Sequence, residues 1–452
     1  MRLTHVTRLA DTVRKLLARG ATRNALHILS QLHPADLARL LGQLPAYRRI
    51  AFQSLMESNP RLASEALSEL GPADSAELVR GMPASRIGLL VQELEMDDAA
   101  ALVAELPEML RENVLRALRG RKATEVRRLL RHGRRTAGRI MSPNVLSVTE
   151  DATVADAIHR LQDSAEFEMV FYLYVIDERH HLLGVLSLRQ LLLKKPETSI
   201  REIMTGNVVR VRTDTDQEEV ADLVASYNLL SIPVVDEENK LVGIVTIDDV
   251  IDIIEEEATE DMYGLAGLNA QERVFTPARS AVRMRTPWLA VNLVAGFLGA
   301  YVVNRFEGTI RQFAVLAVFM PVVASMGGNA AAQTLTVMVR GMALGELRWA
   351  NAGRALFKEL FVGCVNGVVI GAMVALMALV WKGHAILGLV IAISMIGNLL
   401  VAALAGTLVP ITLMWLKVDP ASASSVFVTS VTDACGFLMF LELGELLLGR
   451  FS

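Results

Sequence analysis

Four polar side chains stand at helical spacing inside an apolar segment near the C-terminus: Ser425, Thr429, Thr432 and Asp433. This spacing places them along one face of a helix, and no Lys or Arg occurs in the segment before Arg450. A carboxylate at the centre of a membrane span costs roughly 2.5–3.5 kcal/mol on insertion scales, so it usually faces a bundle interior or a water-filled path. Two interpretations are open: a protonated or hydrogen-bonded core Asp, or a cation site.

A second apolar segment contains the stretch PVVASMGGNAAAQTLT, in which Gly327 and Gly328 predict an interrupted helix. Backbone carbonyls freed in this way must face protein or water inside a membrane. Small residues also serve close helix packing, which is the alternative interpretation. A further segment with Asn398 and Pro410 predicts a second interrupted helix. The second segment adds neutral oxygen ligands at helical spacing: Asn329, Gln333, Thr334 and Thr336.

These candidate ligands are all oxygens, and the His residues of the chain are scattered without metal-ligand spacing. Oxygen ligands select hard cations such as Mg²⁺ or Ca²⁺. Mg²⁺ gives up its water reluctantly and is usually held through one or two carboxylates and several waters. In a twofold dimer Asp433 occurs twice about the axis, so paired carboxylates could grip the water shell of one ion. Weak contact through water lets the ion leave again, as conduction requires.

The elements that must position these ligands are five apolar segments in the C-terminal part of the chain. Each is about as long as the roughly 20 residues with which a helix crosses a lipid bilayer. The segments are Pro287–Val303, Phe313–Val339, Leu356–Trp381, Ile386–Leu416 and Ser425–Leu448.

The loop between the second and third segments is basic, with Arg340, Arg348, Arg354 and Lys358. The opposite loops are poorer in Lys and Arg, and basic loops tend to stay in the cytoplasm. The sequence therefore predicts a multi-pass protein of the cell (inner) membrane with a cytoplasmic N-terminus.

The charge of the chain is unevenly distributed. The chain has a net charge of −4, with most charged residues in the N-terminal part and a mainly apolar C-terminal part. Acidic residues are densest after Asp248. Such a surface disfavours nucleic acid as a partner and favours a response to cations. No nucleophile–base pair, phosphate loop or metalloprotease helix is found, so an enzyme is not predicted.

Two internal repeats organise the N-terminal part. In residues 1–135, short helical stretches closed by prolines recur at about a dozen residues, which predicts an all-α superhelical domain. In residues 136–200 and 201–255, the order strand, helix, strand, strand, helix occurs twice, with Asp177, Gly184 and Ser187 matched by Asp236, Gly243 and Thr246. This repeat resembles a tandem pair of CBS (α/β) domains, which commonly dimerise and bind adenine nucleotides.

The order of the parts completes the pattern. An acidic connecting helix is expected over 256–282, and the five-helix transmembrane domain over 283–452. With the motifs SIPVVDEENKLVGIVTIDDV, EEEATED, GGNAAAQ and SVTDACG, the whole chain resembles the MgtE family of magnesium channels. The resemblance implies a homodimeric, Mg²⁺-selective channel with its pore between the subunits.

The resemblance also implies residue roles. The Asp433 carboxylate binds the pore ion with help from the Thr429 carbonyl, and the pore is lined by Asn329, Gln333, Thr336 and Ser425. Mg²⁺ sensor sites lie between the N domain, the CBS pair and the connecting helix, so that high cytosolic Mg²⁺ closes the pore. The matching sensor acids are Asp97, Glu218, Asp249, Asp252, Glu257, Glu260 and Asp261.

Several positions depart from the family pattern. Ala101 and Asn228 stand where sensor acids are expected, Ala332 replaces a polar pore residue, and Ser425-Val426 replaces an Asn-Pro pair. These changes predict weaker or fewer sensor ions and a different pore entrance.

A nucleotide site is implied in the CBS pair. Tyr172 and Arg189 match ATP-binding positions, whereas Gln190 stands where an Asp usually holds the ribose. ATP binding therefore stays open.

Two other functions stay open as well. One is a transporter for another divalent cation such as Co²⁺ or Mn²⁺, which the sequence separates poorly from Mg²⁺. The other is a membrane-tethered CBS nucleotide sensor, which would not need an acid within the membrane.

Overall fold

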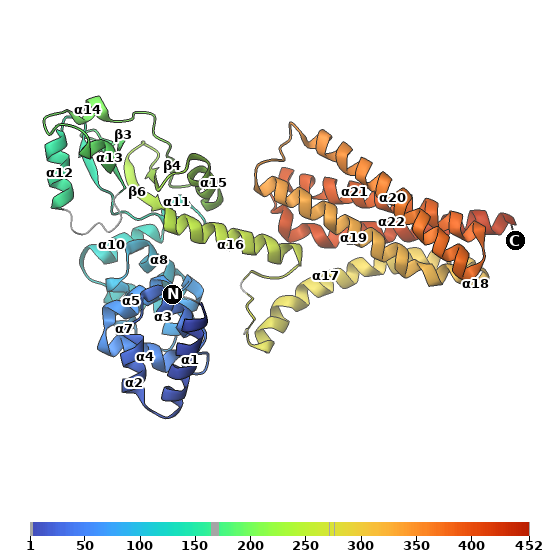
Figure 1. Ribbon diagram of the computed structural model, residues 1–452, viewed down its shortest axis with the longest axis horizontal. Coiled ribbons are helices and arrows are strands. Elements are labelled where there is room, and N and C mark those ends of the chain that lie inside the picture. Colours follow the sequence, from blue (N-terminus) through green and yellow to red (C-terminus); the bar gives the residue numbers. More distant parts are fainter. Residues whose placement is uncertain (1–2, 164–170, 271, 275, 452) are drawn as a thin grey trace. The chain divides into compact units, whose positions relative to one another are not determined.

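The computed structural model describes residues 3–163, 171–270, 272–274 and 276–451. The chain forms two compact units, Met1–Glu255 and Glu256–Ser452. Figure 1 shows the helical and mixed domains of the first unit and the long helices of the second.

The first unit begins with an all-α domain of short helices. Prolines begin α3, α5 and α6, because the fixed φ of proline fits a first helical turn whose N–H has no partner in the helix. The helices are α1 (Leu3–Ala18), α2 (Thr22–Leu29), α3 (Pro34–Gly42), α4 (Arg48–Ser58), α5 (Pro60–Ser68), α6 (Pro72–Val79), α7 (Ala84–Glu93), α8 (Met96–Glu105), α9 (Glu108–Ala117) and α10 (Gly120–Leu129).

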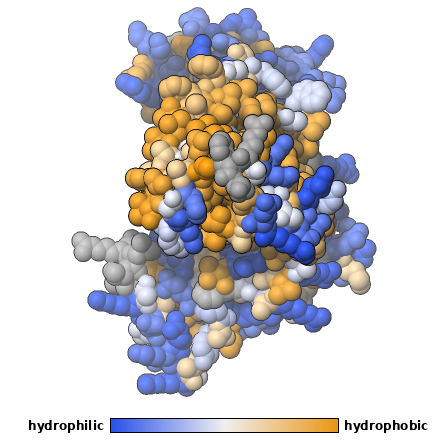
Figure 2. All heavy atoms as spheres, turned by 90° about the vertical axis from the view of Figure 1, so that its right-hand side faces the viewer, coloured by the Kyte–Doolittle hydropathy of each residue, from blue (hydrophilic) through white to orange (hydrophobic). Residues whose placement is uncertain are grey.

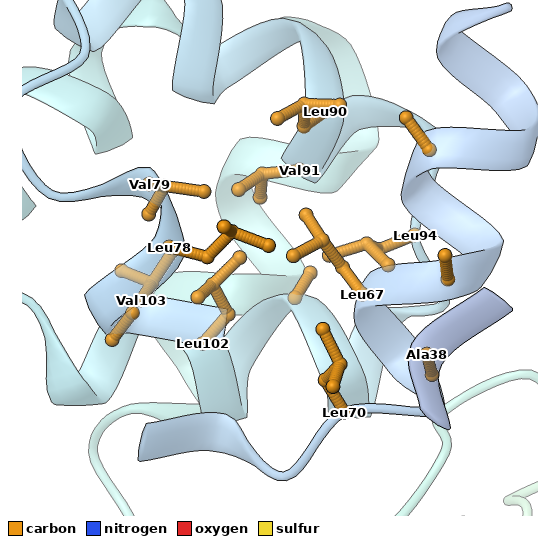
Figure 3. Close-up of a cluster of buried hydrophobic side chains, with 14 of the residues drawn as sticks. Ala38, Leu67, Leu70, Leu78, Val79, Leu90, Val91, Leu94, Leu102 and Val103 are labelled. Atoms are coloured by element: carbon orange, nitrogen blue, oxygen red, sulfur yellow. The ribbon is translucent and has the colours of Figure 1, made fainter. Parts of the chain in front are cut away.

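Most of these helices pack against the helix two places further along the chain, as α5 does with α7 and α6 with α8, while α4 packs mainly against its neighbour α5. The interior is filled by Leu and Val side chains that converge from several helices, among them Leu67, Leu78, Leu90 and Leu102 (Figure 3). This stacking of short hairpins confirms the predicted superhelical domain.

Two three-stranded sheets follow, and they confirm the predicted CBS repeat. In each, the first strand pairs in parallel with the second, which pairs antiparallel with the third. The first copy contains α11 (Ala137–Ile140), β1 (Ser147–Thr149), α12 (Val154–Gln162), β2 (Tyr172–Ile176), β3 (Leu182–Ser187) and α13 (Leu188–Leu192). The second contains α14 (Ile200–Ile203), β4 (Val211–Arg212), α15 (Gln217–Tyr227), β5 (Ser231–Val235), β6 (Leu241–Thr246) and α16 (Ile247–Leu265).

The two copies are joined symmetrically through their hairpin turns. The Leu182 N–H donates to the Asn239 carbonyl at 3.0 Å, and the Leu241 N–H donates to the His180 carbonyl at 2.9 Å. A buried hydrogen bond of 3.0 Å also links the Tyr174 and Ser231 hydroxyls. The pair is therefore a single structural body.

The second unit contains five helices that are long and apolar enough to cross a membrane. Figure 2 shows hydrophobic residues gathered in the part of the surface that faces the viewer. The helices are α17 (Ala278–Arg305), α19 (Val315–Ala343), α20 (Ala352–Lys382), α21 (Ala385–Trp415) and α22 (Pro420–Phe451), with the short α18 (Glu307–Gln312) after α17. The five predicted membrane segments are confirmed.

Glycines set the spacing of these helices. A Cβ at Gly363, Gly367 or Gly371 of α20 would lie within 3.0 Å of α21 atoms, at Leu399, Ile396 and Ala392 respectively. Since lipid gives no hydrophobic drive for helices to associate, such close backbone contact supplies much of the attraction.

The predicted interruptions of α19 and α21 are wrong, because both helices are continuous. Gly327 is buried and lies against Asn398 of α21, where a side chain would collide with the amide. Pro410 is likewise buried within α21. Close helix packing, the alternative interpretation, therefore explains Gly327.

The acidic connecting helix differs from the expected range 256–282. Helix α16 begins earlier, at Ile247, and ends at Leu265. Gly267 follows with a left-handed φ of +68°. Helices commonly end at a glycine in this conformation, because glycine has no Cβ that would clash there. Between α16 and α17, the Glu272 carboxylate accepts a hydrogen bond of 2.8 Å from Arg285 Nε.

Candidate cation sites

Helix α22 positions Asp433 about halfway along its length, where the residue is half-buried. One turn earlier, Thr429 is exposed, and its hydroxyl donates to the Ser425 carbonyl at 2.9 Å. The Thr429 carbonyl accepts a hydrogen bond of 2.9 Å from the hydroxyl of Thr432, which is fully buried. Because α22 is a continuous helix here, the same carbonyl also accepts the backbone N–H four residues further on, so both of its lone pairs are in use within the helix.

Helix α19 presents three of the predicted pore-lining residues, Asn329, Gln333 and Thr336, on its exposed surface. The Thr336 hydroxyl donates to the Ala332 carbonyl at 2.8 Å within the helix. Polar side chains on a membrane helix normally face protein or water rather than lipid. This surface therefore requires a partner or an aqueous path.

Glu359 of α20 is a buried carboxylate that the sequence analysis missed. Its oxygens accept hydrogen bonds from the Thr334 hydroxyl at 3.1 Å and from Lys358 Nζ at 2.6 Å. With Gln333 and Asn366 it lines a cavity of about 230 Å³ between α19, α20 and α21. The adjacent Lys-Glu pair near the start of an apolar segment is the signal that could have revealed it.

A group of carboxyls in the first unit surrounds the start of α8 and of α16. Asp97 is 9% exposed, and burial raises its pKa. Burial, together with the charge of Asp97, raises the pKa of Asp98 to about 7. The same two causes hold the pKa of Asp249 well above its ordinary value, although the Thr246 hydroxyl donates to its Oδ2 at 2.7 Å. We call Asp97, Asp98 and Asp249 the α8–α16 acid group.

Lys122 of α10 lies beside this group, and sequence analysis did not single it out. Its ammonium donates a hydrogen bond to the Leu94 carbonyl, immediately before α8. Burial lowers the pKa of Lys122, while the carboxyls of Asp97, Glu95 and Asp98 act in the opposite direction. An internal cation thus partly offsets the repulsion among the acids.

Of two other predicted sensor residues, Asp252 lies near this group, because its charge contributes to the raised pKa of Asp98. Burial and the charges of Glu255 and Asp248 raise the pKa of Asp252. Glu218 is exposed on the first turn of α15.

The remaining predicted sensor acids lie on the second half of α16. Burial, followed by the charges of Asp419, Glu257 and Glu260, raises the pKa of Asp261 to about 6. Asp419 precedes α22, where its carboxylate accepts a hydrogen bond of 2.9 Å from the Ala421 N–H. Asp261 therefore lies near the start of the helix that carries Asp433.

The acids come near one another without forming a closed metal site. Across the described residues, no group of three His, Cys, Asp or Glu side chains converges tightly enough to hold a metal ion. Carboxylates at this looser spacing suit Mg²⁺, which keeps several of its waters and is bound through few protein ligands.

The predicted nucleotide positions lie at the edge of the first CBS copy. Tyr172 is half-buried at the start of β2, and Arg189 is exposed on α13. Gln190 caps α13, since its Oε1 accepts from the Ser187 N–H at 2.9 Å and from the Ser187 hydroxyl at 3.0 Å. The acceptor at this position is therefore already in use within the protein.

The chain combines a five-helix membrane unit that carries a half-buried acid with a CBS pair and an acid-rich helical domain. These features define the class of protein: a membrane protein that transports cations and is regulated by soluble domains. Comparison with protein families agrees. Residues 320–443 match a family described as divalent cation transporter, MgtE. Residues 32–134 match the MgtE intracellular N domain, and 137–196 and 200–256 match CBS domains. The chain belongs to the MgtE family.

Known relatives resemble the chain over most of its length. The magnesium transporter MgtE of Thermus thermophilus is 35% identical over 448 residues, which cover 98% of this chain and 99% of the relative. The magnesium transporter MgtE of Bacillus subtilis is 34% identical over 426 residues, 94% of each chain. A solved cytosolic domain of the Mg²⁺ channel MgtE in complex with ATP is 39% identical, covers 54% of this chain and 99% of that structure, and superposes with a TM-score of 0.50.

Proposed function

We infer that this protein is a Mg²⁺ channel that mediates magnesium uptake and is regulated by its N and CBS domains. Relatives named magnesium transporters match it along almost the whole chain. The observation in the membrane unit that carries the inference is the half-buried carboxylate of Asp433 midway along an apolar helix.

We propose that Asp433 holds the permeating ion through its water shell. A carboxylate attracts the ion without stripping its water, which Mg²⁺ gives up reluctantly. The Thr429 carbonyl, one turn earlier on α22, is proposed to assist through the same water shell. Contact through water keeps binding weak enough for the ion to leave, as conduction requires.

The exposed polar surface of α19 supports a homodimer. Asn329 and Thr336 lie on the surface of one copy, where lipid offers no hydrogen bonds. A second copy placed against α19 and α22 would enclose these side chains around an aqueous path and bring two Asp433 carboxylates to one axis. Ser425 would lie two turns before Asp433 on the same path.

Regulation is proposed to act through the acids of the first unit and of α16. At low Mg²⁺ the carboxylates of the α8–α16 acid group repel one another and the soluble domains separate, which opens the pore. At high Mg²⁺ ions bridge the carboxyls, and the compact state closes it. A near-complete switch takes about 5.5 kcal/mol of differential binding, which several weak sites can supply together.

Limited proteolysis across a Mg²⁺ titration tests this regulation. Cleavage near residues 255–263 is expected to decrease as Mg²⁺ rises, because the compact state protects the connecting helix. Cleavage that does not change with Mg²⁺ would count strongly against the mechanism.

The proposed membrane topology places the N-terminus in the cytoplasm. It rests on the basic loop between α19 and α20, where Arg340, Arg348 and Arg354 are exposed. Cysteine labelling from either side of the cell membrane at positions 348 and 384 would test the orientation, since the two loops should label from opposite sides.

ATP is a candidate regulator, because a relative's cytosolic domain was solved in complex with it. Tyr172 offers a ring for stacking and Arg189 a charge for phosphate, while Gln190 is occupied as a cap. Calorimetric titration of ATP into the full-length protein, repeated with Arg189→Ala, should show weakened binding in the variant if these residues form the site.

Uptake into Mg²⁺-starved cells is the decisive experiment. Wild-type protein should restore growth and uptake, and Asp433→Ala should not. Competition by Co²⁺ and Mn²⁺ in the same assay separates a magnesium channel from a transporter of another divalent ion. An active Asp433→Ala variant would favour a membrane-tethered nucleotide sensor instead.

A further inference from the structure

Asn398 is a fully buried amide in α21, with no exposed surface. Burying an amide in an apolar region costs several kcal/mol unless its hydrogen bonds are satisfied. The nearby Ser394 is equally buried, but its hydroxyl bonds to the Val390 carbonyl within the same helix. Asn398 instead reaches a neighbouring helix, so its contacts connect elements of the bundle.

The Asn398 amide is enclosed by two glycines on different helices. Its Nδ2 donates a hydrogen bond of 2.9 Å to the Val323 carbonyl of α19. A Cβ at Gly327, one turn further along α19, would collide with Nδ2, and a Cβ at Gly436 of α22 would lie 2.8 Å from Oδ1. Only glycine therefore fits at both positions while the amide is present.

The oxygen of the amide has no conventional hydrogen-bond donor among the described residues. The Cβ direction of Gly436 meets the flat face of this amide, with Oδ1 at 2.8 Å and Cγ and Nδ2 both at 2.9 Å from the Cβ position. Contacts of this kind between a Cα–H and an oxygen recur where helices approach closely and are individually weak. The arrangement thus links α21 to α19 by a strong bond and to α22 by close approach.

The position of this junction relates it to the ion path. Gly436 follows Asp433 by three residues, a rise of about 4.5 Å along the helix. On α19, Gly327 precedes Gly328, whose Cβ position is open space, and the exposed Asn329. One amide therefore touches both helices within a turn of their candidate ion-facing residues.

We propose that Asn398 is a positioning residue of the ion path: its amide, seated between Gly327 and Gly436, sets the placement of the Asp433 carboxylate relative to α19. This inference rests on the proposed role of Asp433. Contact with a hydrated ion depends on the distance between opposing oxygens, so a shift of α22 by the thickness of one methyl group changes both affinity and selectivity.

Substitutions at Asn398 test the proposal first. Asn398→Leu keeps the volume but loses the bond to Val323, and Asn398→Asp keeps the shape but cannot donate when ionised. Each should lower Mg²⁺ uptake per folded dimer about tenfold or more. This is the size of loss expected when the buried Val323 carbonyl no longer has a hydrogen-bond donor. Each should also weaken the preference for Mg²⁺ over Ca²⁺.

A matched control separates positioning from stability. Ser394→Ala removes an equally buried polar group without an interhelical partner and should leave uptake and ion preference at wild-type levels. The amount of folded dimer is measured by size-exclusion chromatography in detergent. Variants at Asn398 that lose only folded protein, with uptake per dimer and half-saturating Mg²⁺ unchanged, would overturn the proposal.

A double-mutant cycle gives the sharper test. Gly436→Ala alone should abolish most uptake, because its methyl collides with the amide. Combining it with Asn398→Ala removes the collision and should recover uptake several-fold over Gly436→Ala. A double variant no better than Gly436→Ala would show that the contact does not limit function.

Asp433→Asn, measured in the same assay, distinguishes the two levels of inference. If Asp433→Asn conducts Mg²⁺ normally, the proposed pore site itself fails. If Asp433→Asn is inactive while the Asn398 variants behave as wild type, the pore site stands and only the positioning role is wrong.

Discussion

The two units of the molecule handle carboxyl groups in opposite ways. In the first unit, burial raises the pKa values of Asp97, Asp98 and Asp249, the charge of Asp97 raises those of the other two further, and Lys122 partly offsets the repulsion. In the membrane unit, the buried Glu359 has a lysine and a threonine as partners. Water near the first unit tolerates unbalanced charge, whereas the membrane demands that a buried charge be paired.

This contrast suggests a division of tasks. Neighbouring carboxylates repel one another, and a bound divalent cation relieves this repulsion. Such a group therefore suits a sensor. A single carboxylate such as Asp433 binds an ion only weakly, which suits a path that must release it. Each prediction below tests one side of the comparison.

The largest effect is expected at Asp433, where the charge itself is required. Asp433→Asn keeps the size of the side chain and removes the charge, so Mg²⁺ uptake should fall by about 10- to 100-fold, matching the 1.5–3 kcal/mol of a charged hydrogen bond. Asp433→Glu keeps the charge and should retain part of the activity. Uptake measured with a Mg²⁺-sensitive fluorescent dye would check both variants. An Asp433→Asn variant that is active would contradict the model of permeation.

A second prediction concerns pH and the acid group. The pKa of Asp98 is raised to about 7 in the compact unit, so the stability due to its protonated form is present at acid pH and is lost as pH rises through 7. Compact Mg²⁺-free protein should therefore be more easily cleaved at pH 8 than at pH 6. Mg²⁺ competes with this proton in the compact state, so the extra protection that saturating Mg²⁺ gives over Mg²⁺-free protein should be larger at pH 8 than at pH 6.

The control for this pH effect is Asp98→Asn. The variant has no proton to displace at this position, so its Mg²⁺ dependence should change much less over the same pH range. An equal pH effect in Asp98→Asn would assign the titration to another group.

A third prediction concerns the internal cation. Lys122→Gln leaves the repulsion of the acid group without its offset, so the Mg²⁺-free protein should open more readily, by about 1 kcal/mol or roughly fivefold. Proteolysis rates without Mg²⁺ measure the change, and saturating Mg²⁺ should cancel it. The neighbouring Arg121→Gln, which removes an exposed charge, is the matched control and should have little effect.

The smallest effect on uptake is expected at Glu359, where the charge is structural. Glu359→Gln keeps an acceptor for Thr334 and loses only the pair with the largely exposed Lys358, so uptake should stay within about twofold. Glu359→Ala leaves a buried hydroxyl without its partner and should destabilise the folded protein by about 1–3 kcal/mol. Thermal unfolding in detergent compares the two, and a strong loss of uptake in Glu359→Gln would give this carboxylate a role in the ion path.

The architecture was largely predictable because repeats and periodic patterns in the sequence indicate it. Regular prolines predicted the helical hairpins, the matched Asp177 and Asp236 predicted the paired sheets, and long apolar runs predicted the five spans. A lone Asp433 in such a run was equally visible. These signals are local in sequence, so a single chain reveals them.

The errors and omissions have a common physical origin, which is contact between distant segments. Gly327 looked like a helix breaker because its partner Asn398 lies 71 residues away. Lys122 carried no local sign of the acids on α8. The buried partner of Glu359, Thr334, lies 25 residues earlier in the chain. Packing decides each of these cases, and one sequence does not display packing.

Helix α17 has a consequence for how the protein is made. Its one buried residue is Gly299, where an added Cβ would lie 3.6 Å from the ring of Phe437 of α22, while most of its apolar side chains are exposed. The first span to leave the ribosome therefore finds its main partner only when the fifth has been synthesised. Until then it must remain in the lipid without a neighbour, so loss of the fifth span during translation would strand it and expose the nascent chain to quality-control proteases.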